Sequence, residues 1–263
     1  MPLFENVEGF KGVSPALQWA IFIVGALIVV VAAVSVVISI WLAIKYVKFN
    51  RKNNSRNLSG ASAARKILDK HGLQHIKVSV TGSLLFGNSY SHYFKKVRIR
   101  RLTNKKPTIT SLAMGAEKSA LAILDKEGDK DMKTRVALTP WIYFGPFAFI
   151  PLMVVGIAID FLVFNFNGVA TTVAAALGLV IYVISFVLSI MTLKTEKKAQ
   201  DLACKILKED DMATDEEIGM MKELFTLYNI QYINDIVLEF LQMILKILEF
   251  VAKMQSDSGS SGD

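Results

Sequence analysis

The sequence predicts a mainly α-helical integral membrane protein with three transmembrane helices, a small cytoplasmic α+β region and C-terminal helices. Two observations predict this class. The chain is 52% hydrophobic, and its longest apolar runs exceed the ~20 residues that a helix needs to cross a bilayer. Basic residues follow the first apolar run at once, and the positive-inside rule places such clusters in the cytoplasm.

The first transmembrane helix is predicted at residues 17–46, after an exposed N-terminal segment at residues 1–16. Trp19 and Trp41 stand where the two membrane interfaces would lie. Because the basic cluster follows the run, we expect the N-terminus to lie outside the cell. No basic stretch precedes the run, which argues against a cleaved signal peptide.

A basic cytoplasmic region is predicted at residues 47–138. After a polar linker it forms a helix over residues 61–70, which His71-Gly72 would end. Residues 76–80 and 96–101 alternate in polarity and predict a small antiparallel sheet. The candidates for its inner face are Val78, Val80, Val97 and Ile99.

A second helix of this region is predicted at residues 112–124, LAMGAEKSALAIL. Strong helix formers dominate the stretch, and Thr110 or Ser111 can cap its start. A charged connection over residues 125–136 then leads the chain back to the membrane.

A transmembrane hairpin is predicted at residues 139–193, with spans at 139–164 and 169–193. Its tight turn would hold Asn165, Asn167 and Gly168. Basic residues flank the base of the hairpin, which places that base in the cytoplasm. Asp160 lies near the outer end of the first span. An acid inside a membrane indicates function by default, but this position is close enough to the surface to favour simple hydration.

Cytoplasmic helices are predicted at residues 194–254, and the C-terminus with them in the cytoplasm. The chain breaks at Asp210–Asp215, where Thr214 can start a new helix that runs to about Tyr228. The last helix, residues 232–254, is amphipathic, and its charges argue against a fourth span. It could pack on other helices, lie on the membrane or pair with a partner. Residues 255–263 have the composition of a flexible tail.

Charge is distributed unevenly along the chain. Residues 48–107 hold fifteen Lys or Arg and one acid, whereas residues 194–263 hold eight basic and fourteen acidic residues. The basic segment is compatible with binding anionic lipid or RNA. The alternative is that the acidic segment neutralises it within the fold.

Side chains that could bind metal or attack a substrate are few. The single cysteine, Cys204, excludes an internal disulfide and a multi-cysteine zinc site. His71 and His75 have i,i+4 spacing, but Gly72 separates them at a helix end; these two and His92 are read as solvated loop histidines. The chain has no glycine-rich phosphate loop and no serine-hydrolase elbow.

Several short segments resemble, in the same order, the bacterial membrane-anchored neutral zinc metallopeptidase family. The resemblance covers about Leu58 to Leu248. One matching segment is Ser59-Gly60-Ala61, with the helix that follows it and ends before His71-Gly72-Leu73. The others are Asn88–Tyr93 with the strand after it, Arg135–Pro140 before the hairpin, and Thr192-Leu193 with Glu196 after it.

The resemblance implies a zincin-like α+β region and a zinc site at the helix 112–124. Members of the family carry His-Glu-x-x-His there, with both histidines on zinc and the glutamate polarising water. Here the histidine positions hold Ala116 and Ala120, Glu117 stands at the general-base position, and Glu196 at the third-ligand position. Since methyl groups cannot coordinate zinc, the resemblance implies a degenerate site with no catalytic residues, no metal ligands and no cofactor. Lys118 and Lys197 are candidates to pair with Glu117.

The leading hypothesis is therefore a catalytically inactive homologue that acts as a scaffold, adaptor or subunit of a membrane complex. Its expected partners are the bilayer and proteins of the membrane or its cytoplasmic face; a homo-oligomer stays open. One alternative is a metal-dependent peptidase with an altered site that uses His71, His75 or His92 with Glu117 and Glu196. Another is an anionic-lipid or RNA-binding membrane protein.

Overall fold

The computed structural model describes residues 12–82, 87–164 and 168–260; the side chains of residues 141–149, 189 and 257–260 lie outside this description. The chain divides into two compact units. The apolar unit comprises Met1–Val36, Pro140–Ser189 and Ile233–Asp263, and the α+β unit comprises Val37–Thr139 and Ile190–Tyr232.

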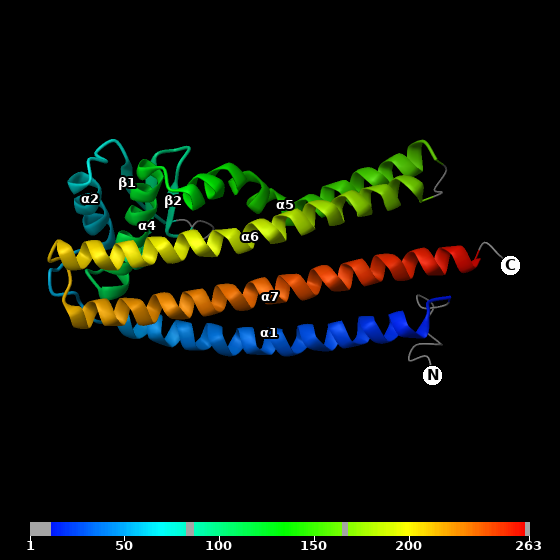
Figure 1. Ribbon diagram of the computed structural model, residues 1–263, viewed down its shortest axis with the longest axis horizontal. Helices are drawn as coiled ribbons and strands as arrows, with labels where there is room; N and C mark the ends of the chain where they lie inside the picture. Colours follow the sequence, from blue (N-terminus) through cyan, green and yellow to red (C-terminus); the bar gives the residue numbers. More distant parts are fainter. Residues whose placement is uncertain (1–11, 83–86, 165–167, 261–263) are drawn as a thin grey trace. The chain divides into compact units, whose positions relative to one another are not determined.

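Long helices dominate the chain (Figure 1). They are α1 (Pro15–Phe49), α5 (Lys130–Leu162), α6 (Val169–Glu209) and α7 (Asp215–Ser260). The short helices are α2 (Gly60–Lys70), α3 (Arg101–Asn104) and α4 (Ile109–Glu127). The strands are β1 (Lys77–Thr81), β2 (Ser89–Ser91) and β3 (Lys96–Arg100).

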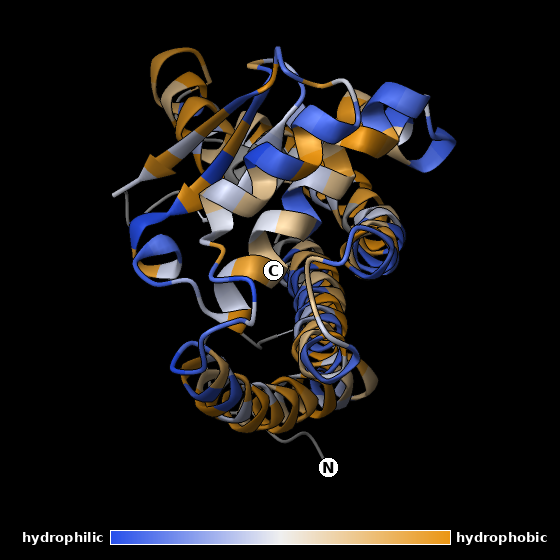
Figure 2. Ribbon diagram, turned by 90° about the vertical axis from the view of Figure 1, so that its left-hand side faces the viewer, coloured by the Kyte–Doolittle hydropathy of each residue, from blue (hydrophilic) through white to orange (hydrophobic). Residues whose placement is uncertain are grey.

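Two helices, α1 and α6, are long and apolar enough to cross a membrane. Helix α1 is predominantly hydrophobic along its length (Figure 2). The prediction of three such helices is reduced to two for the described residues. The predicted span 139–164 includes residues 141–149, whose side chains are not described, and the remaining apolar stretch of α5, Ile150–Leu162, is shorter than a bilayer requires.

Helices α5 and α6 pack closely within the apolar unit. A Cβ placed on Gly156 would come within 2.7 Å of the Ala174 side chain, so the glycine permits the close approach. Asp160 is buried at 2% exposure and accepts hydrogen bonds from the backbone N–H groups of Ala170 and Thr171, at 2.9 and 2.7 Å. The expectation of a hydrated Asp160 is therefore wrong, because its carboxylate caps the start of α6. Of the predicted turn residues, Asn165 and Asn167 lie outside the described residues.

Helix α7 runs as one continuous helix to Ser260, where the sequence suggested an interruption after Tyr228 and a flexible tail from residue 255. In the apolar unit its Gln255 accepts from the Ser14 N–H at 3.1 Å, and Asp235 accepts from the Ser35 hydroxyl at 3.4 Å. Phe240 stacks on Phe186 of α6 with ring centroids 5.4 Å apart. Of the three placements left open for this helix, packing on other helices is the one observed.

The sheet of the α+β unit has the strand order β1-β3-β2. β1 pairs with β3 in parallel, and β2 pairs with β3 in antiparallel orientation. The predicted antiparallel pairing of residues 76–80 with 96–101 is therefore wrong, because the short strand β2 lies between them in sequence and the chain returns to β3 in the direction of β1. Val97 and Ile99 are fully buried, whereas Val80 is exposed on the edge strand.

Helices α2 and α4 cover the sheet and form the core of this unit. Helix α2 begins after the cap Ser59, one residue earlier than predicted. It ends at His71-Gly72, as predicted, and Gly72 has the left-handed φ of 69°. Helix α4 begins three residues earlier than predicted, because the Thr108 hydroxyl accepts from the Ser111 N–H and caps it there. Thr110 and Ser111 lie inside the helix.

Acidic residues from the α6–α7 connection and the start of α7 neutralise basic residues of the α+β unit. Lys45 pairs with Glu223 at 2.5 Å, Lys52 with Glu216 at 2.8 Å, and Lys70 with Asp210 at 2.5 Å. Arg56 pairs with Asp211. The two oppositely charged segments of the sequence thus meet within the fold. Thr214 and Glu217 form the predicted capping box at the start of α7.

We predict that Gly115→Ala destabilises the protein. A methyl group at Gly115 would overlap the carbonyl of Gly60, where α2 crosses α4, and such overpacking costs about 1–3 kcal/mol of the free energy of unfolding. Gly219→Ala is the matched control, since a Cβ on this α7 residue meets nothing within 4 Å. The control should stabilise the helix by about 0.5–1 kcal/mol. Thermal unfolding followed by circular dichroism measures both, and equal effects would contradict the close approach.

Candidate functional site

The candidate site lies on the face of α4 that carries Ala116, Glu117 and Ala120. Positions 116 and 120 are one helical turn apart, so they share a face of the helix. Both alanines are fully buried, and Glu117 is 4% exposed. A carboxylate at this depth needs compensating partners, and the structure provides them from α4 itself and from α6.

Glu117 has two direct polar partners. The ammonium of Lys118 lies 2.9 Å from its Oε2, and the Gln200 side chain donates to its Oε1 at 3.0 Å. The side-chain amide of Asn229 on α7 in turn donates to Oε1 of Gln200 at 2.8 Å. Glu117 is therefore buried and paired rather than solvated, and Lys118 is the one of its two candidate partners that pairs with it. Lys197, the other candidate, is exposed.

Glu196 of α6 lies against the same ammonium. Lys118 donates to its Oε2 at 3.1 Å, and Arg135 of α5 donates to its Oε1 at 2.5 Å. The structure thus brings Glu117 and Glu196 together, as the resemblance implied, but the ammonium of Lys118 contacts both carboxylates. The side chain of Lys118 is 13% exposed. We call Glu117, Lys118, Arg135 and Glu196 the charge cluster.

The two carboxylates of the charge cluster have opposite pKa shifts. Burial raises the pKa of Glu117, and Lys118 offsets this only in part. Burial also acts to raise the pKa of Glu196, but Lys118 and Arg135 outweigh it and hold that pKa below its usual range. Burial acts to lower the pKa of Lys118, and the two carboxylates more than reverse this, so its pKa is raised. Lys118 is therefore held firmly in its charged form.

These residues do not fit a zinc ion. A catalytic zinc takes three protein ligands from nitrogen, sulfur or oxygen donors and keeps one position for water. Ala116 and Ala120 offer methyl groups, and the ammonium of Lys118 lies within hydrogen-bond distance of both remaining carboxylates. Across the described parts of the chain, no group of three or more His, Cys, Asp or Glu side chains is placed to hold a metal ion.

The histidines lie elsewhere. His92 has its Nδ1 2.7 Å from a carboxylate oxygen of Asp125, which also accepts from the Tyr90 hydroxyl at 2.5 Å. His71 is the C-cap of α2, and His75 is exposed. Cys204 is buried, and burial raises the pKa of its thiol.

Sequence reasoning missed Arg135, Gln200 and Asn229 as members of the site. One signal was present for Gln200, because it follows Glu196 by four residues and so shares its face of α6. Arg135 and Asn229 reach the site through tertiary packing of α5 and α7, which no local pattern shows. Lys198, two residues beyond Glu196, is not a member of the site. It pairs with Asp131 and, at 3.0 Å, with Asp129.

We predict that Lys118→Met lowers the free energy of unfolding by about 3 kcal/mol at pH 7, since it leaves a buried carboxylate without its cation. The loss should depend on pH. In the variant the folded-state pKa of Glu117 rises further above the unfolded-state value of about 4.3. Below about pH 4.3 this carboxyl is protonated in both states and costs no stability. Stability is lost as pH rises from there through the folded-state pKa. The deficit relative to wild type should therefore shrink towards pH 4.

Chemical denaturation at several pH values measures this deficit. Lys197→Met is the matched control, because it removes the same charge from an exposed neighbouring position, and it should change stability by less than about 0.5 kcal/mol. A deficit that is equal at all pH values, or equal in the two variants, would contradict the role of Lys118.

Residues 24–252 match the sequence family described as "Putative neutral zinc metallopeptidase". No curated protein and no solved structure matches the chain. The family match spans most of the chain, including α4, the hairpin of α5 and α6, and most of α7. The protein therefore belongs to the neutral zinc metallopeptidase family that this match defines.

Proposed function

We propose that this protein is a catalytically inactive member of its family that acts by binding, as a scaffold, adaptor or subunit at the cytoplasmic face of a membrane. The observation that carries the proposal is the position of Lys118. Its ammonium bridges Glu117 and Glu196 at 2.9 and 3.1 Å, and the two positions where the family resemblance expects histidine hold Ala116 and Ala120.

The chemistry of an ammonium group supports this proposal. In a metallopeptidase the divalent cation polarises the scissile carbonyl and lowers the pKa of its bound water. A lysine ammonium donates hydrogen bonds but has no open coordination position. Glu117, which would act as general base, is engaged by Lys118 and Gln200. These contacts favour a structural role for the charge cluster.

Membrane placement rests on the apolar lengths of α1 and α6 and on the basic residues that follow α1. By the positive-inside rule, the α+β unit lies in the cytoplasm and the N-terminus outside. Several large apolar side chains of this unit are strongly exposed, among them Tyr93 at 61%, Phe94 at 71% and Leu102 at 66%. We propose that a partner at the cytoplasmic face contacts such side chains.

The first test of the proposal is metal content and proteolysis. The full chain, purified in detergent without chelators, should contain well below one zinc per chain by elemental mass spectrometry. It should also fail to cleave casein. One zinc per chain together with cleavage that a chelator abolishes would overturn the proposal in favour of a metallopeptidase with an altered site.

The second test restores the missing ligands. Ala116→His/Ala120→His combined with Lys118→Val should bind zinc through the two new imidazoles and Glu196, and zinc should raise its melting temperature. The matched variant that keeps Lys118 should bind zinc more weakly, because the ammonium competes for Glu196. Since larger side chains in a packed core cost about 1–3 kcal/mol, circular dichroism first confirms that both variants fold.

Equal zinc affinity in the two folded variants would show that Lys118 does not occupy the cation position. Folded variants that both ignore zinc would show that positions 116 and 120 do not face Glu196. Either result would remove the structural basis of the proposal.

A further inference from the structure

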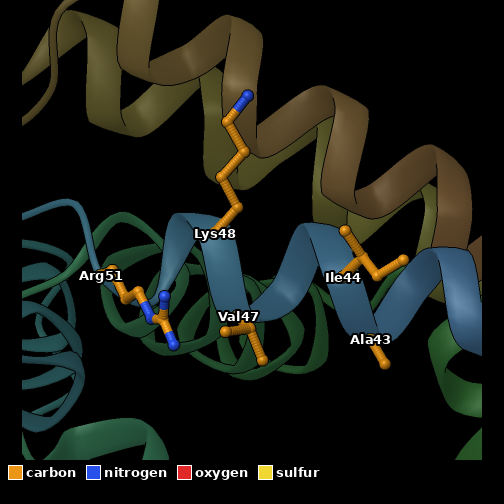
Figure 3. A pocket seen from close by; sticks show the side chains of 5 residues that line it. All are labelled: Ala43, Ile44, Val47, Lys48 and Arg51. Carbon is orange, nitrogen blue, oxygen red and sulfur yellow. The ribbon is translucent and has the colours of Figure 1, made fainter.

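A shallow, largely open pocket of about 640 Å³, which we call the groove, lies along the surface of α1 where its apolar run ends (Figure 3). Its apolar wall is followed, one turn later, by two cations. The residues that line it are Ala43, Ile44, Val47, Lys48 and Arg51. Ala43, Ile44, Val47 and Lys48 recur at three- and four-residue spacing and so share one face of α1. Arg51 lies in the turn that follows the end of the helix at Phe49. The opposite face, with Leu42, Tyr46 and Phe49, packs into the core of the α+β unit.

The cations at this end of α1 fall into two groups. Lys45, Lys52 and Arg56 each pair with an acid of residues 211–223. Lys48 and Arg51 are exposed, and within the described parts of the chain no acid pairs with either. The groove therefore presents two uncompensated positive charges next to an exposed apolar wall, in which Ile44 is 60% and Val47 46% exposed.

We propose that this groove binds an anionic phospholipid, with an acyl chain along Ala43, Ile44 and Val47. Lys48 and Arg51, whose side chains extend to opposite sides in Figure 3, would flank its headgroup. The proposal rests on the membrane placement of α1 given above. Basic side chains at the cytoplasmic end of a spanning helix lie at the depth of the lipid headgroups. The planar guanidinium of Arg51 suits a phosphate, and the ammonium of Lys48 adds a second charge.

The apolar wall distinguishes this ligand from others that carry phosphate. RNA would also attract the two cations, but it has no aliphatic chain to cover Ile44 and Val47. A zwitterionic phosphatidylcholine offers the chain and the phosphate, but its own quaternary ammonium cancels the net charge that Lys48 and Arg51 would meet. An anionic headgroup with an acyl chain satisfies both parts of the groove.

The test is lipid retention by the full chain. Protein purified in mild detergent is mixed with equal amounts of phosphatidylglycerol and phosphatidylcholine, and retained lipid is counted by native mass spectrometry. Wild type should retain phosphatidylglycerol preferentially. At about fivefold for each cation, Lys48→Ala/Arg51→Ala should weaken its retention by roughly 25-fold. Lys52→Ala/Arg56→Ala removes the same net charge from paired positions and should change retention by less than about twofold, since such exposed pairs contribute little.

Equal losses in the two double variants would overturn the proposal, because net charge alone would then explain retention. Equal retention of the two lipids by wild type would overturn it as well. If Lys48→Ala/Arg51→Ala leaves lipid retention unchanged but abolishes binding of an RNA oligonucleotide, the groove is an RNA site. Lys48→Arg/Arg51→Lys keeps both charges and should keep retention.

Failure of the membrane placement is measured separately. If alkaline carbonate releases the wild-type chain from membranes, α1 does not span, and the proposed function fails together with this inference. If the chain stays in the membrane pellet and lipid preference is absent, only this inference fails.

Discussion

The ammonium of Lys118 is the constraint on which the α+β unit depends. It lies between two carboxylates that burial would otherwise leave uncompensated, Glu117 on α4 and Glu196 on α6. Arg135 on α5 balances the second carboxylate, so two cations face two anions. Hydrogen bonds through Gln200 extend the network to Asn229 on α7. Charges thus join α4, α5 and α6, and hydrogen bonds add α7. In a poorly hydrated site, loss of Lys118 would leave Glu117 without its cation.

This arrangement separates two roles that a catalytic metal performs together. A bound divalent ion holds helices in place by attracting their carboxylates, and it also activates water. The lysine retains the first role, because it attracts both carboxylates at hydrogen-bond distance. Membership of the family alone therefore does not decide the activity of this chain.

The sequence was most informative where local chemistry determines the outcome. His71-Gly72 ends α2 as predicted, and Thr214 starts α7 as predicted. The pairing of Glu117 with Lys118 was also among the expectations. Strand direction was not predictable, because β1 and β3 have the same alternation whether they pair in parallel or antiparallel, and the three-residue strand β2 is too short to show a periodicity.

Other features depended on contacts between distant segments. Burial of Asp160 requires the start of α6 to fold back onto α5, and the sequence shows only an acid near the end of an apolar run. Arg135 looked like a residue that sets membrane topology, yet it donates to Glu196 sixty-one positions away. The role of such a charged residue depends on its partner. The positions of the candidate site could therefore be predicted from the sequence, whereas its ion pairs and hydrogen bonds could not.

The pairing of early cations with late acids has a consequence for biosynthesis. Lys45, Lys52, Arg56 and Lys70 are neutralised by residues 210–223, which leave the ribosome only after both hairpin helices. With α1 in the membrane, as proposed, the nascent α+β unit would until then carry its full basic charge beside the bilayer. Attraction to anionic headgroups would hold the unfinished unit at the membrane surface, and the arrival of the acidic segment would release it into its final fold.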